Sequence, residues 1–261
     1  MIGNGDIFSY SDYEEKLLNQ ISSGDEGEHG KNNNLIPVVY LYSTCVYCRL
    51  SKIHGRSRLQ RYSRLANWDY ISQVACSQSP DYPQIPMIGN GDIFSYSDYE
   101  EKLLNQISSG DEGEHGKKNN LIPCAMLGRG ALIKPWLPTE IKEKRNWDIS
   151  ATERLDMLKD FVRFGLEHWG TDQQGVNHTR RFLLEWISFL YRYVPVGLLE
   201  VLPQQMNQRP PLHMCGRSDL ETLMMSKNCA DWIKISEILL GPVPEGFQFE
   251  PKHKANSYVK K

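Results

Sequence analysis

Short apolar segments alternate with helical segments over residues 50–147, and this alternation constrains the fold more than any other feature. Strands that alternate with helices predict a parallel sheet in an α/β architecture. The expected elements are a strand end at 50–53, a helix at about 58–77, a strand at 84–88, a helix near 97–107 and a strand at 121–127.

Beyond Trp147 the pattern becomes helical, without strands. A capping-box sequence at 150–153 begins the first helix, and a second apolar stripe follows at 182–190. Further helices are expected at about 197–208 and 218–240. The apolar faces of these helices are interpreted as the core of a helix bundle.

Residues 1–31 recur letter for letter as residues 87–117, and the match continues to Pro123 with one difference. Solenoid repeats diverge while keeping their period and need about three units to bury a core. Two near-identical copies separated by unlike sequence therefore indicate a recent duplication or an error in the assembled sequence. Residues 1–49 are treated as an atypical N-terminal segment, and the charged, glycine-rich residues 108–120 as a flexible loop.

The net charge is −2, but the charge is distributed unevenly. Residues 1–118 hold 11 Lys and Arg against 16 Asp and Glu, whereas residues 119–261 hold 19 against 16. A basic stretch from Arg49 to Arg64, with Trp68 nearby, has the charge to meet a phosphate backbone. The simpler interpretation of this stretch is a solvated helix face.

The composition favours an intracellular protein, cytoplasmic and possibly also nuclear. No apolar segment approaches the length of about 18 residues that a membrane span needs. The six cysteines fit free thiols better than a disulfide scaffold. Cys45 and Cys48 have the spacing of a redox pair or half a zinc site, but no second pair completes it, so no metal is expected.

Two of the expected strands end in glycine-flanked polar turns. The first turn is Gly89-Asn90-Gly91-Asp92, and the second is Gly128-Arg129-Gly130. Glycine lets the backbone approach a ligand closely, and barrels often bind phosphate after their last two strands. The pair of turns therefore predicts a site for a phosphorylated cofactor.

Several motifs resemble the tRNA-dihydrouridine synthases, and the most particular of them resemble the eukaryotic branch of that family. The motifs are Ile88-Gly89-Asn90-Gly91-Asp92-Ile93, Met126-Leu127-Gly128-Arg129-Gly130-Ala131, Lys134-Pro135-Trp136, His54-Gly55-Arg56, Gly165 to Gly170, Thr179 to Trp186 and Pro251 to Asn256. The resemblance implies the last strands of a partial (β/α)8 TIM barrel at 50–147, a helical tRNA-binding bundle at 148–245 and a basic tail at 246–261.

The resemblance also implies an activity, which is the reduction of uridine to 5,6-dihydrouridine in tRNA. FMN would be the cofactor, NADPH or NADH the reductant and tRNA the partner, with no obligatory protein partner. The residues implied to hold FMN are His54, Asn90, Gly91, Asp92, Gly128 and Arg129. The residues implied to contact tRNA, or to be plain surface charge, are Arg56, Arg180, Arg181, Lys252 and Lys254.

The sequence departs from the family in one respect that matters for catalysis. The Asn-x-Gly-Cys-Pro surroundings of the family's catalytic cysteine are absent, so neither Cys45 nor Cys48 is assigned and the catalytic residue is unknown. We expect the chain alone to bind FMN poorly and to be inactive. The alternatives are a non-catalytic tRNA-binding fragment or pseudoenzyme, and another FMN-barrel oxidoreductase that acts on a small molecule.

Overall fold

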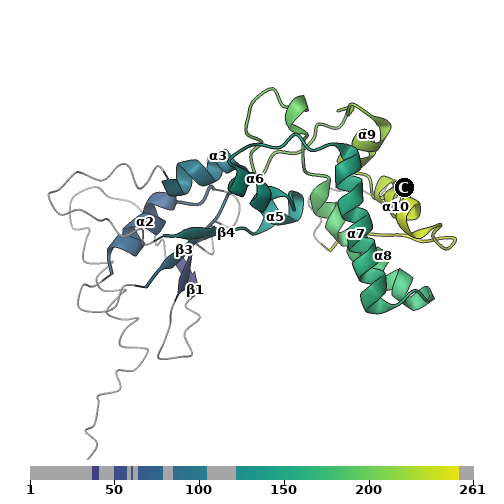
Figure 1. The fold of residues 1–261 in the computed structure, drawn as a ribbon, viewed down its shortest axis with the longest axis horizontal. Helices are drawn as coiled ribbons and strands as arrows, with labels where there is room; N and C mark the ends of the chain where they lie inside the picture. The colour runs from purple at the N-terminus through teal and green to yellow at the C-terminus, as the bar shows by residue number, and fades with distance from the viewer. Residues whose placement is uncertain are drawn as a thin grey trace, which may run out of the picture. The chain divides into compact units, whose positions relative to one another are not determined.

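The computed structural model describes residues 37–40, 50–57, 60, 64–78, 85–104 and 122–252 (Figure 1). All of them belong to one compact unit, Ile36–Lys261. The first copy of the duplication, Cys45 and Cys48, the expected loop 108–120 and Lys254 lie outside the described residues. None of the helices described has the length and apolar character needed to cross a membrane.

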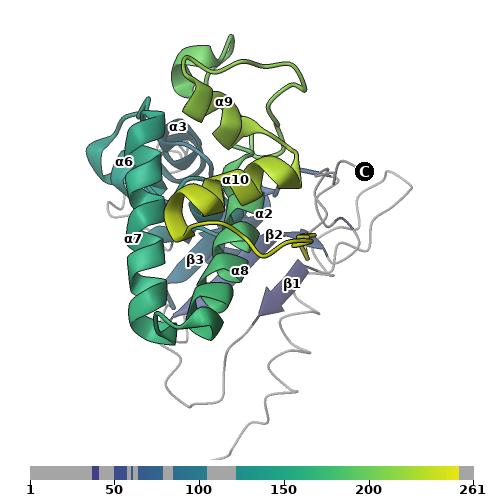
Figure 2. The ribbon, with the colours of Figure 1, turned by 90° about the vertical axis from the view of Figure 1, so that its right-hand side faces the viewer.

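Four strands form one sheet in the order β1-β2-β3-β4 (Figures 1 and 2). They are β1 (Pro37–Tyr40), β2 (Ser51–Ser57), β3 (Met87–Asn90) and β4 (Cys124–Met126). Strands β2, β3 and β4 run parallel, which confirms the predicted parallel sheet. Strand β1 pairs antiparallel with the other edge of β2.

Helix α2 (Trp68–Cys76) connects β2 to β3 and packs against both strands. The side-chain oxygen of Asn67 caps it by accepting a hydrogen bond from the backbone N–H of Tyr70 at 2.8 Å. Trp68, Ile71 and Ile53 are buried together in one core under the sheet. The predicted start near residue 58 was wrong, because the backbone N–H of Asn67 is bonded to the Gly55 carbonyl, and this keeps residue 67 outside the helix.

The connection from β3 to β4 begins with α3 (Tyr96–Tyr99), which continues as a π-helical turn, η1 (Glu100–Leu104). The sequence predicted a single regular helix here, near 97–107. Two short helices, α5 (Arg129–Ile133) and α6 (Leu137–Glu143), then follow β4.

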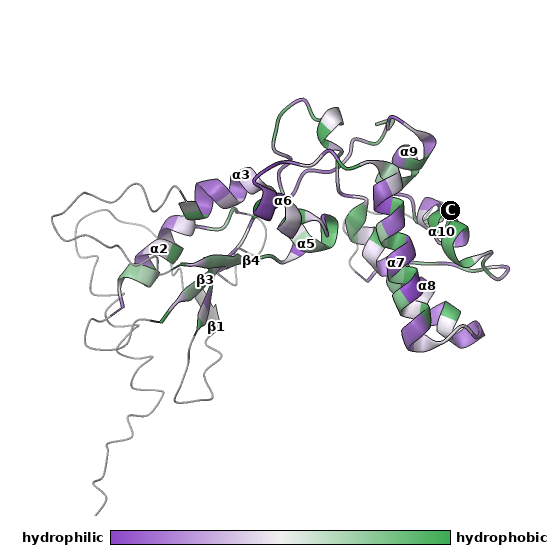
Figure 3. Ribbon diagram, in the orientation of Figure 1, coloured by the Kyte–Doolittle hydropathy of each residue, from purple (hydrophilic) through white to green (hydrophobic). Residues whose placement is uncertain are grey.

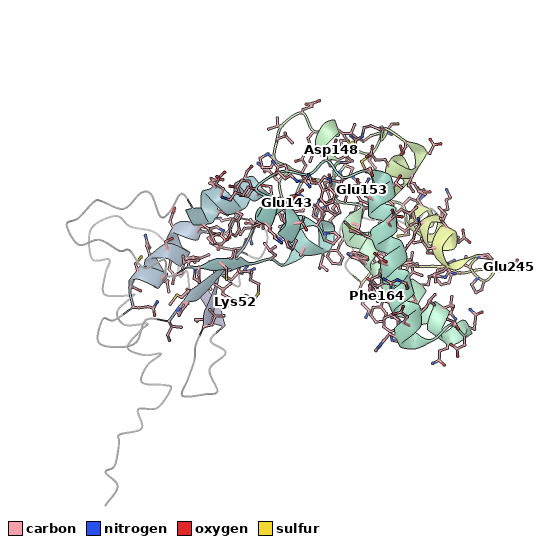
Figure 4. The ribbon with its side chains drawn as sticks, viewed as in Figure 1. Lys52, Glu143, Asp148, Glu153, Phe164 and Glu245 are labelled. Atoms are coloured by element: carbon pink, nitrogen blue, oxygen red, sulfur yellow. The ribbon has the colours of Figure 1, made fainter. Side chains whose placement is uncertain are left out.

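Two long helices, α7 (Ala151–Trp169) and α8 (Gln173–Leu190), lie side by side, and α10 (Cys229–Leu240) packs across them (Figures 1 and 2). The capping box is confirmed: Ser150 Oγ accepts from the Glu153 N–H, and the Glu153 carboxylate accepts from the Ser150 N–H at 2.9 Å. Figure 4 labels Glu153 in the first turn of α7.

One face of each long helix is apolar and the other polar, as the mixed colours along α7 and α8 show (Figure 3). The apolar faces share a core with α9 (Asp219–Met225) and α10. Its fully buried members include Leu183, Leu184 and Trp232.

Two predictions about the C-terminal helices were wrong. Only one 3₁₀ turn, η2 (Val196–Leu198), forms where a helix was expected at 197–208, in a segment that contains Pro203. The helix expected at 218–240 is divided into α9 and α10, because Asn228 caps a new helix start and Ser226 accepts a hydrogen bond from the indole of Trp232 at 2.8 Å.

Candidate functional site

A cavity of about 170 Å³ lies at the carboxyl ends of the three parallel strands. All six residues predicted to hold a cofactor line it: His54, Asn90, Gly91, Asp92, Gly128 and Arg129. Arg56, Ile93, Met126 and Met206 complete the lining. The strand register explains the convergence, since His54 is level with Asn90 and Asn90 with Met126 across the sheet.

His54 is fixed by the neighbouring strand. Its Nδ1 lies 2.8 Å from the backbone carbonyl of Asn90. Because a carbonyl oxygen only accepts, Nδ1 carries the proton in this bond, and Nε2 of a neutral ring remains an acceptor. The Asn90 side chain continues the row by donating to the Met126 carbonyl at 2.7 Å. The three strands therefore hold the ring in one orientation beside the cavity.

The turn after β3 has backbone angles that favour glycine. Gly91 has φ 135° and Asp92 has φ 52°. A Cβ on Gly91 would lie 2.4 Å from the Cβ of Ala66, so no larger residue fits there. The buried indole of Trp68 donates to the Gly91 carbonyl at 2.9 Å, and this bond ties the turn to α2. Trp68 is thus part of the turn's support and does not lie on an exposed basic face.

Asp92 is the anchor of the turn and is 8% exposed. Its carboxylate accepts from the backbone N–H of Ala66 at 2.6 Å and from the guanidinium of Arg56. Arg129 Nη2 lies 3.9 Å from the other carboxylate oxygen. The carboxylate therefore orders two cations at the cavity, and in this arrangement it holds Arg56 and Arg129 more directly than it could hold a phosphate itself.

Gly128 leaves one side of the cavity open. A Cβ built on Gly128 would meet no atom within 4 Å. Gly130, two residues later, is crowded instead, because its Cβ would lie 2.4 Å from the Ile93 carbonyl oxygen. The two glycines of this motif thus have different tasks: Gly128 keeps space free beside Arg129, and Gly130 allows close packing of α5 on the turn after β3.

A buried ion pair that the sequence did not single out supports this region. Lys134 Nζ lies 2.6 Å from a carboxylate oxygen of Glu140 and donates to the Phe94 carbonyl at 3.1 Å. Glu140 is fully buried and also accepts from the indole of Trp136 at 3.2 Å. Burial lowers the pKa of Lys134, and the charge of Glu140 opposes that effect.

Two of the expected tRNA contacts are buried in the structure. Arg56 is 3% exposed and holds Asp92, as described above. Arg180 is 2% exposed and donates to Ser236 Oγ and to the Gly241 carbonyl, both at 2.9 Å. Arg180 therefore satisfies the C-terminal end of α10. Both guanidinium groups are engaged inside the protein, so the structure gives neither residue support as a tRNA contact.

The other described candidates for tRNA contact are exposed, unlike Arg56 and Arg180. Arg181, next to Arg180 on α8, is exposed, and so is Lys252. The backbone N–H of Lys252 lies 3.2 Å from a carboxylate oxygen of Glu185, which belongs to α8 as Arg181 does. Within the described ranges no three His, Cys, Asp or Glu side chains gather as metal ligands.

The fold and this site together define a class: an α/β protein whose parallel strands end at a cavity lined by guanidinium, imidazole and glycine backbone groups. The family model described as "Dihydrouridine synthase (Dus)" matches residues 48–188. The chain belongs to the dihydrouridine synthase family.

Curated relatives agree with this assignment. The chain is 58% identical over 209 residues to a Xenopus tropicalis protein named "tRNA-dihydrouridine(47) synthase [NAD(P)(+)]-like". Proteins of the same name from Xenopus laevis and Oryza sativa subsp. japonica are 59% and 57% identical over 209 and 206 residues. These matches cover 79–80% of the chain, and the chain spans about 30% of the length of the relatives.

Proposed function

We propose that this chain carries the phosphate-binding end of an FMN site in a synthase that reduces uridine to dihydrouridine in tRNA, with NADPH or NADH as reductant. The observation that carries the proposal is the convergence of His54, the Asn90–Asp92 turn and the Gly128–Arg129 turn on one cavity. The names of the relatives supply the substrate and the nicotinamide reductant.

The residues of the cavity fit the phosphate of FMN. Arg129, aligned by Asp92, supplies a planar guanidinium that suits a phosphate dianion. The open space at Gly128 admits a ligand next to the backbone. The imidazole of His54, held at a fixed angle by Asn90, would lie beside the bound molecule. When bound, the flavin supplies the hydride that reduces the uracil ring; the residues described here bind and orient it.

We further propose that β2, β3 and β4 are the last strands of a (β/α)8 barrel covering residues 50–147. Residues 148–245 would then form a helical tRNA-binding domain, followed by a basic tail at 246–261. The exposed Arg181 and Lys252 are the supported candidates for phosphate contacts with tRNA, and Lys254 remains a candidate on the resemblance alone. We place a protein of this kind in the cytoplasm, with the nucleus as an additional compartment.

The chain alone is expected to bind FMN poorly, so the test compares its weak affinities for FMN and for riboflavin, which lacks the phosphate, in a fluorescence titration of the 261-residue chain. We expect FMN to bind more tightly than riboflavin, and Arg129→Met to weaken FMN about tenfold, as the loss of one charge-assisted hydrogen bond does. Arg163→Met, on the exposed face of α7, removes the same charge far from the strand ends and is the control. Equal affinity for FMN and riboflavin would refute the phosphate site.

Activity needs a separate measurement. Residues 50–252 can replace the matched segment of the Xenopus tropicalis relative, and mass spectrometry can then count dihydrouridine in a tRNA substrate incubated with NADPH. We expect the chimera to form dihydrouridine and its Arg129→Met variant to form much less at limiting FMN. A folded chimera that binds FMN without forming dihydrouridine would contradict the proposed reaction.

A further inference from the structure

The turn that joins α7 to α8 carries aromatic side chains for which the proposed cofactor site has no use. Trp169 is the last residue of α7, and its ring is stacked on that of Phe182 in α8. The two ring centroids are 4.9 Å apart and the planes are inclined by 5°. Phe182 nevertheless remains 49% exposed. The stack therefore presents aromatic surface to solvent.

Three more rings extend this stack along both helices. The exposed His168 meets the ring of Trp169 edge-on at 5.2 Å between centroids, and the exposed His178 lies 6.5 Å from the same ring. Phe164, one turn before His168 on the same side of α7, is 57% exposed (Figure 4 labels it). We call these five residues, Phe164, His168, Trp169, His178 and Phe182, the aromatic surface.

The turn that carries the aromatic surface is closely packed. A Cβ on Gly165 of α7 would lie 2.6 Å from Thr179 Cγ2 on α8. A Cβ on Gly175 would lie 2.1 Å from the carbonyl oxygen of Gly170, so the first turn of α8 packs directly on the end of α7. Asp172 caps α8 by accepting a hydrogen bond from the Gly175 N–H at 2.8 Å. The two helices therefore hold the rings in fixed positions, which reduces the entropy lost when a ligand binds.

Cations accompany the aromatic surface on α8. Arg181 directly precedes Phe182 and is exposed. Glu185, one turn after Arg181 on the same side of α8, accepts a hydrogen bond from the backbone N–H of the exposed Lys252 at 3.2 Å. No ion pair joins Arg181 or Lys252 to another residue within the described ranges. With Glu185 counted, this group has one cation in excess, and both cations are available to the phosphates of a ligand.

Arg163 on α7 differs from these two cations. Its guanidinium lies over the ring of Phe164, 4.2 Å from the centroid. It is also paired with Asp160 at 3.1 Å and with Glu167 at 3.5 Å. The charge of Arg163 is thus balanced within α7, so the attraction of this surface for phosphate comes from Arg181 and Lys252.

Rings beside cations are the combination that unpaired nucleotides require. A base stacks on an aromatic ring while its phosphate meets the cation. A duplex hides the faces of its bases, so it would contact the cations alone. An apolar protein partner would have to remove water from the imidazoles of His168 and His178 and from the charge of Arg181, which costs free energy unless each polar group is paired again. The chemistry of the surface therefore favours single-stranded RNA.

We propose that the aromatic surface binds unpaired nucleotides of tRNA by base stacking, with Arg181 and Lys252 on the neighbouring phosphates. The inference rests on the proposed function and deepens it, because it names the part of the RNA that the helical region recognises. That part is a looped segment whose bases are free to stack on protein rings.

The experiment measures, by fluorescence anisotropy, the affinity of the 261-residue chain for a labelled single-stranded RNA of about 12 nucleotides and for the same strand in a duplex. The variants are Phe182→Leu, Phe182→Tyr and Phe164→Leu. The control is Ile238→Ala, which removes a similarly exposed apolar side chain from α10. Circular dichroism checks the folding of each variant, and Phe164→Leu decides the matter if Phe182→Leu does not fold.

We expect the native chain to prefer the single strand. Phe182→Leu should weaken single-strand binding about tenfold, because leucine fills the space of the ring but offers no π-face, whereas Phe182→Tyr should stay within about twofold of the native affinity. Phe164→Leu should act in the same direction as Phe182→Leu. The dependence of single-strand affinity on salt concentration should not change in these variants, because stacking releases no counterions.

Three results would overturn the proposal. The first is a native chain that binds the duplex as tightly as the single strand, and the second is an unchanged or equal loss for both RNAs in Phe182→Leu and Phe164→Leu. The third is self-association of the chain, measured by sedimentation, that Phe164→Leu abolishes, since the surface would then be an interface between copies. None of these variants touches the cavity at the strand ends, so the comparison of FMN with riboflavin tests the proposed cofactor site separately.

Discussion

Asp92 shows how much of the site depends on one side chain. Its left-handed backbone, its buried carboxylate and the cations around it form one unit. We predict that Asp92→Asn lowers the free energy of unfolding by about 3 kcal/mol, because it removes the carboxylate charge that faces the buried guanidinium of Arg56. Asparagine tolerates the left-handed conformation, so the backbone itself should not be strained by the change.

Urea denaturation measures this change. The control is Asp156→Asn, which removes an exposed carboxylate paired with Lys159 on α7 and should change the unfolding free energy by less than about 0.5 kcal/mol. Similar values for the two variants would mean that Asp92 does not support the turn as described.

Adjacent arginines on α8 should behave in opposite ways. Arg180→Met removes the hydrogen bonds to Ser236 and to the end of α10, so we expect a loss of about 2 kcal/mol in unfolding free energy. Arg181→Met should leave stability unchanged and weaken tRNA binding, with a smaller salt dependence. Thermal denaturation and filter binding of a tRNA transcript separate the two effects. A loss of stability in Arg181→Met would contradict the assignment of Arg181 as an exposed tRNA contact without a structural role.

At the scale of elements, α7 and α8 pack tightly against each other at Gly165. A Cβ there would lie 2.6 Å from Thr179 Cγ2 and 2.9 Å from its hydroxyl oxygen. We predict that Gly165→Ala lowers the unfolding free energy by about 1 to 2 kcal/mol, since overpacking outweighs the gain in helix propensity. In the double variant with Thr179→Ala, the two nearest atoms are removed and the added methyl group keeps only the 3.3 Å contact with the Cβ of residue 179. Denaturation of the native chain, the two single variants and the double variant gives the coupling free energy between residues 165 and 179. Additive changes in unfolding free energy would show that the helices do not meet at these residues.

The sequence predicted some elements well and others poorly, for reasons that lie in the range of the interactions. The start of α7 was predictable because its capping box is a local signal, complete within residues 150–153. The start of α2 was not, because a backbone bond from Asn67 to Gly55, twelve positions away, decides it. The break between α9 and α10 depends on Ser226, whose partners Asp231 and Trp232 were hidden inside an apparently continuous helical pattern.

The residues of the site likewise include some that were predictable from the sequence and some that were not. Its glycine turns were recognisable because parallel strands bring their carboxyl ends to one edge, so His54, Asn90 and Arg129 had to converge. Met206 lines the same cavity from a segment more than 60 residues later in the chain than Arg129, where no local motif marks it. Burial was equally invisible in the sequence, which is why Arg180 was expected on the surface.

On the scale of the whole molecule, a charge network joins the start of α7 to α9. Arg217 Nη1 lies 2.6 Å from Asp148, and Arg217 also donates to the buried Glu221 at 2.9 Å (Figure 4 labels Asp148). The hydrogen bond from Arg217 lowers the pKa of Asp148. Burial alone would raise the pKa of Glu221, but hydrogen bonds from Arg217 lower it overall.

These shifts predict a dependence of stability on pH. Both carboxyl groups have a lower pKa in the folded state than their ordinary values of 3.8 and 4.5. The contribution of these two ionised carboxylates to the free energy of unfolding is therefore complete above about pH 5. It is lost as the pH falls through their pKa values in the folded state. Urea denaturation between pH 6 and pH 3 should show a steeper loss for the native chain than for Arg217→Met. The same slope in Arg217→Met, with Lys234→Met as an exposed control, would refute the role of the network.

Strand β1 occupies the edge of β2 that faces away from β3, and it does so in the antiparallel sense. An uncovered strand edge is a row of free backbone donors and acceptors, ready to pair with any extended chain nearby. Residues 37–40 therefore occupy the backbone groups of β2 with which another extended chain would otherwise pair. A parallel barrel neighbour would need that same row of backbone groups, so completing a barrel on this side requires an exchange of strands, in which β1 must leave before its replacement can enter.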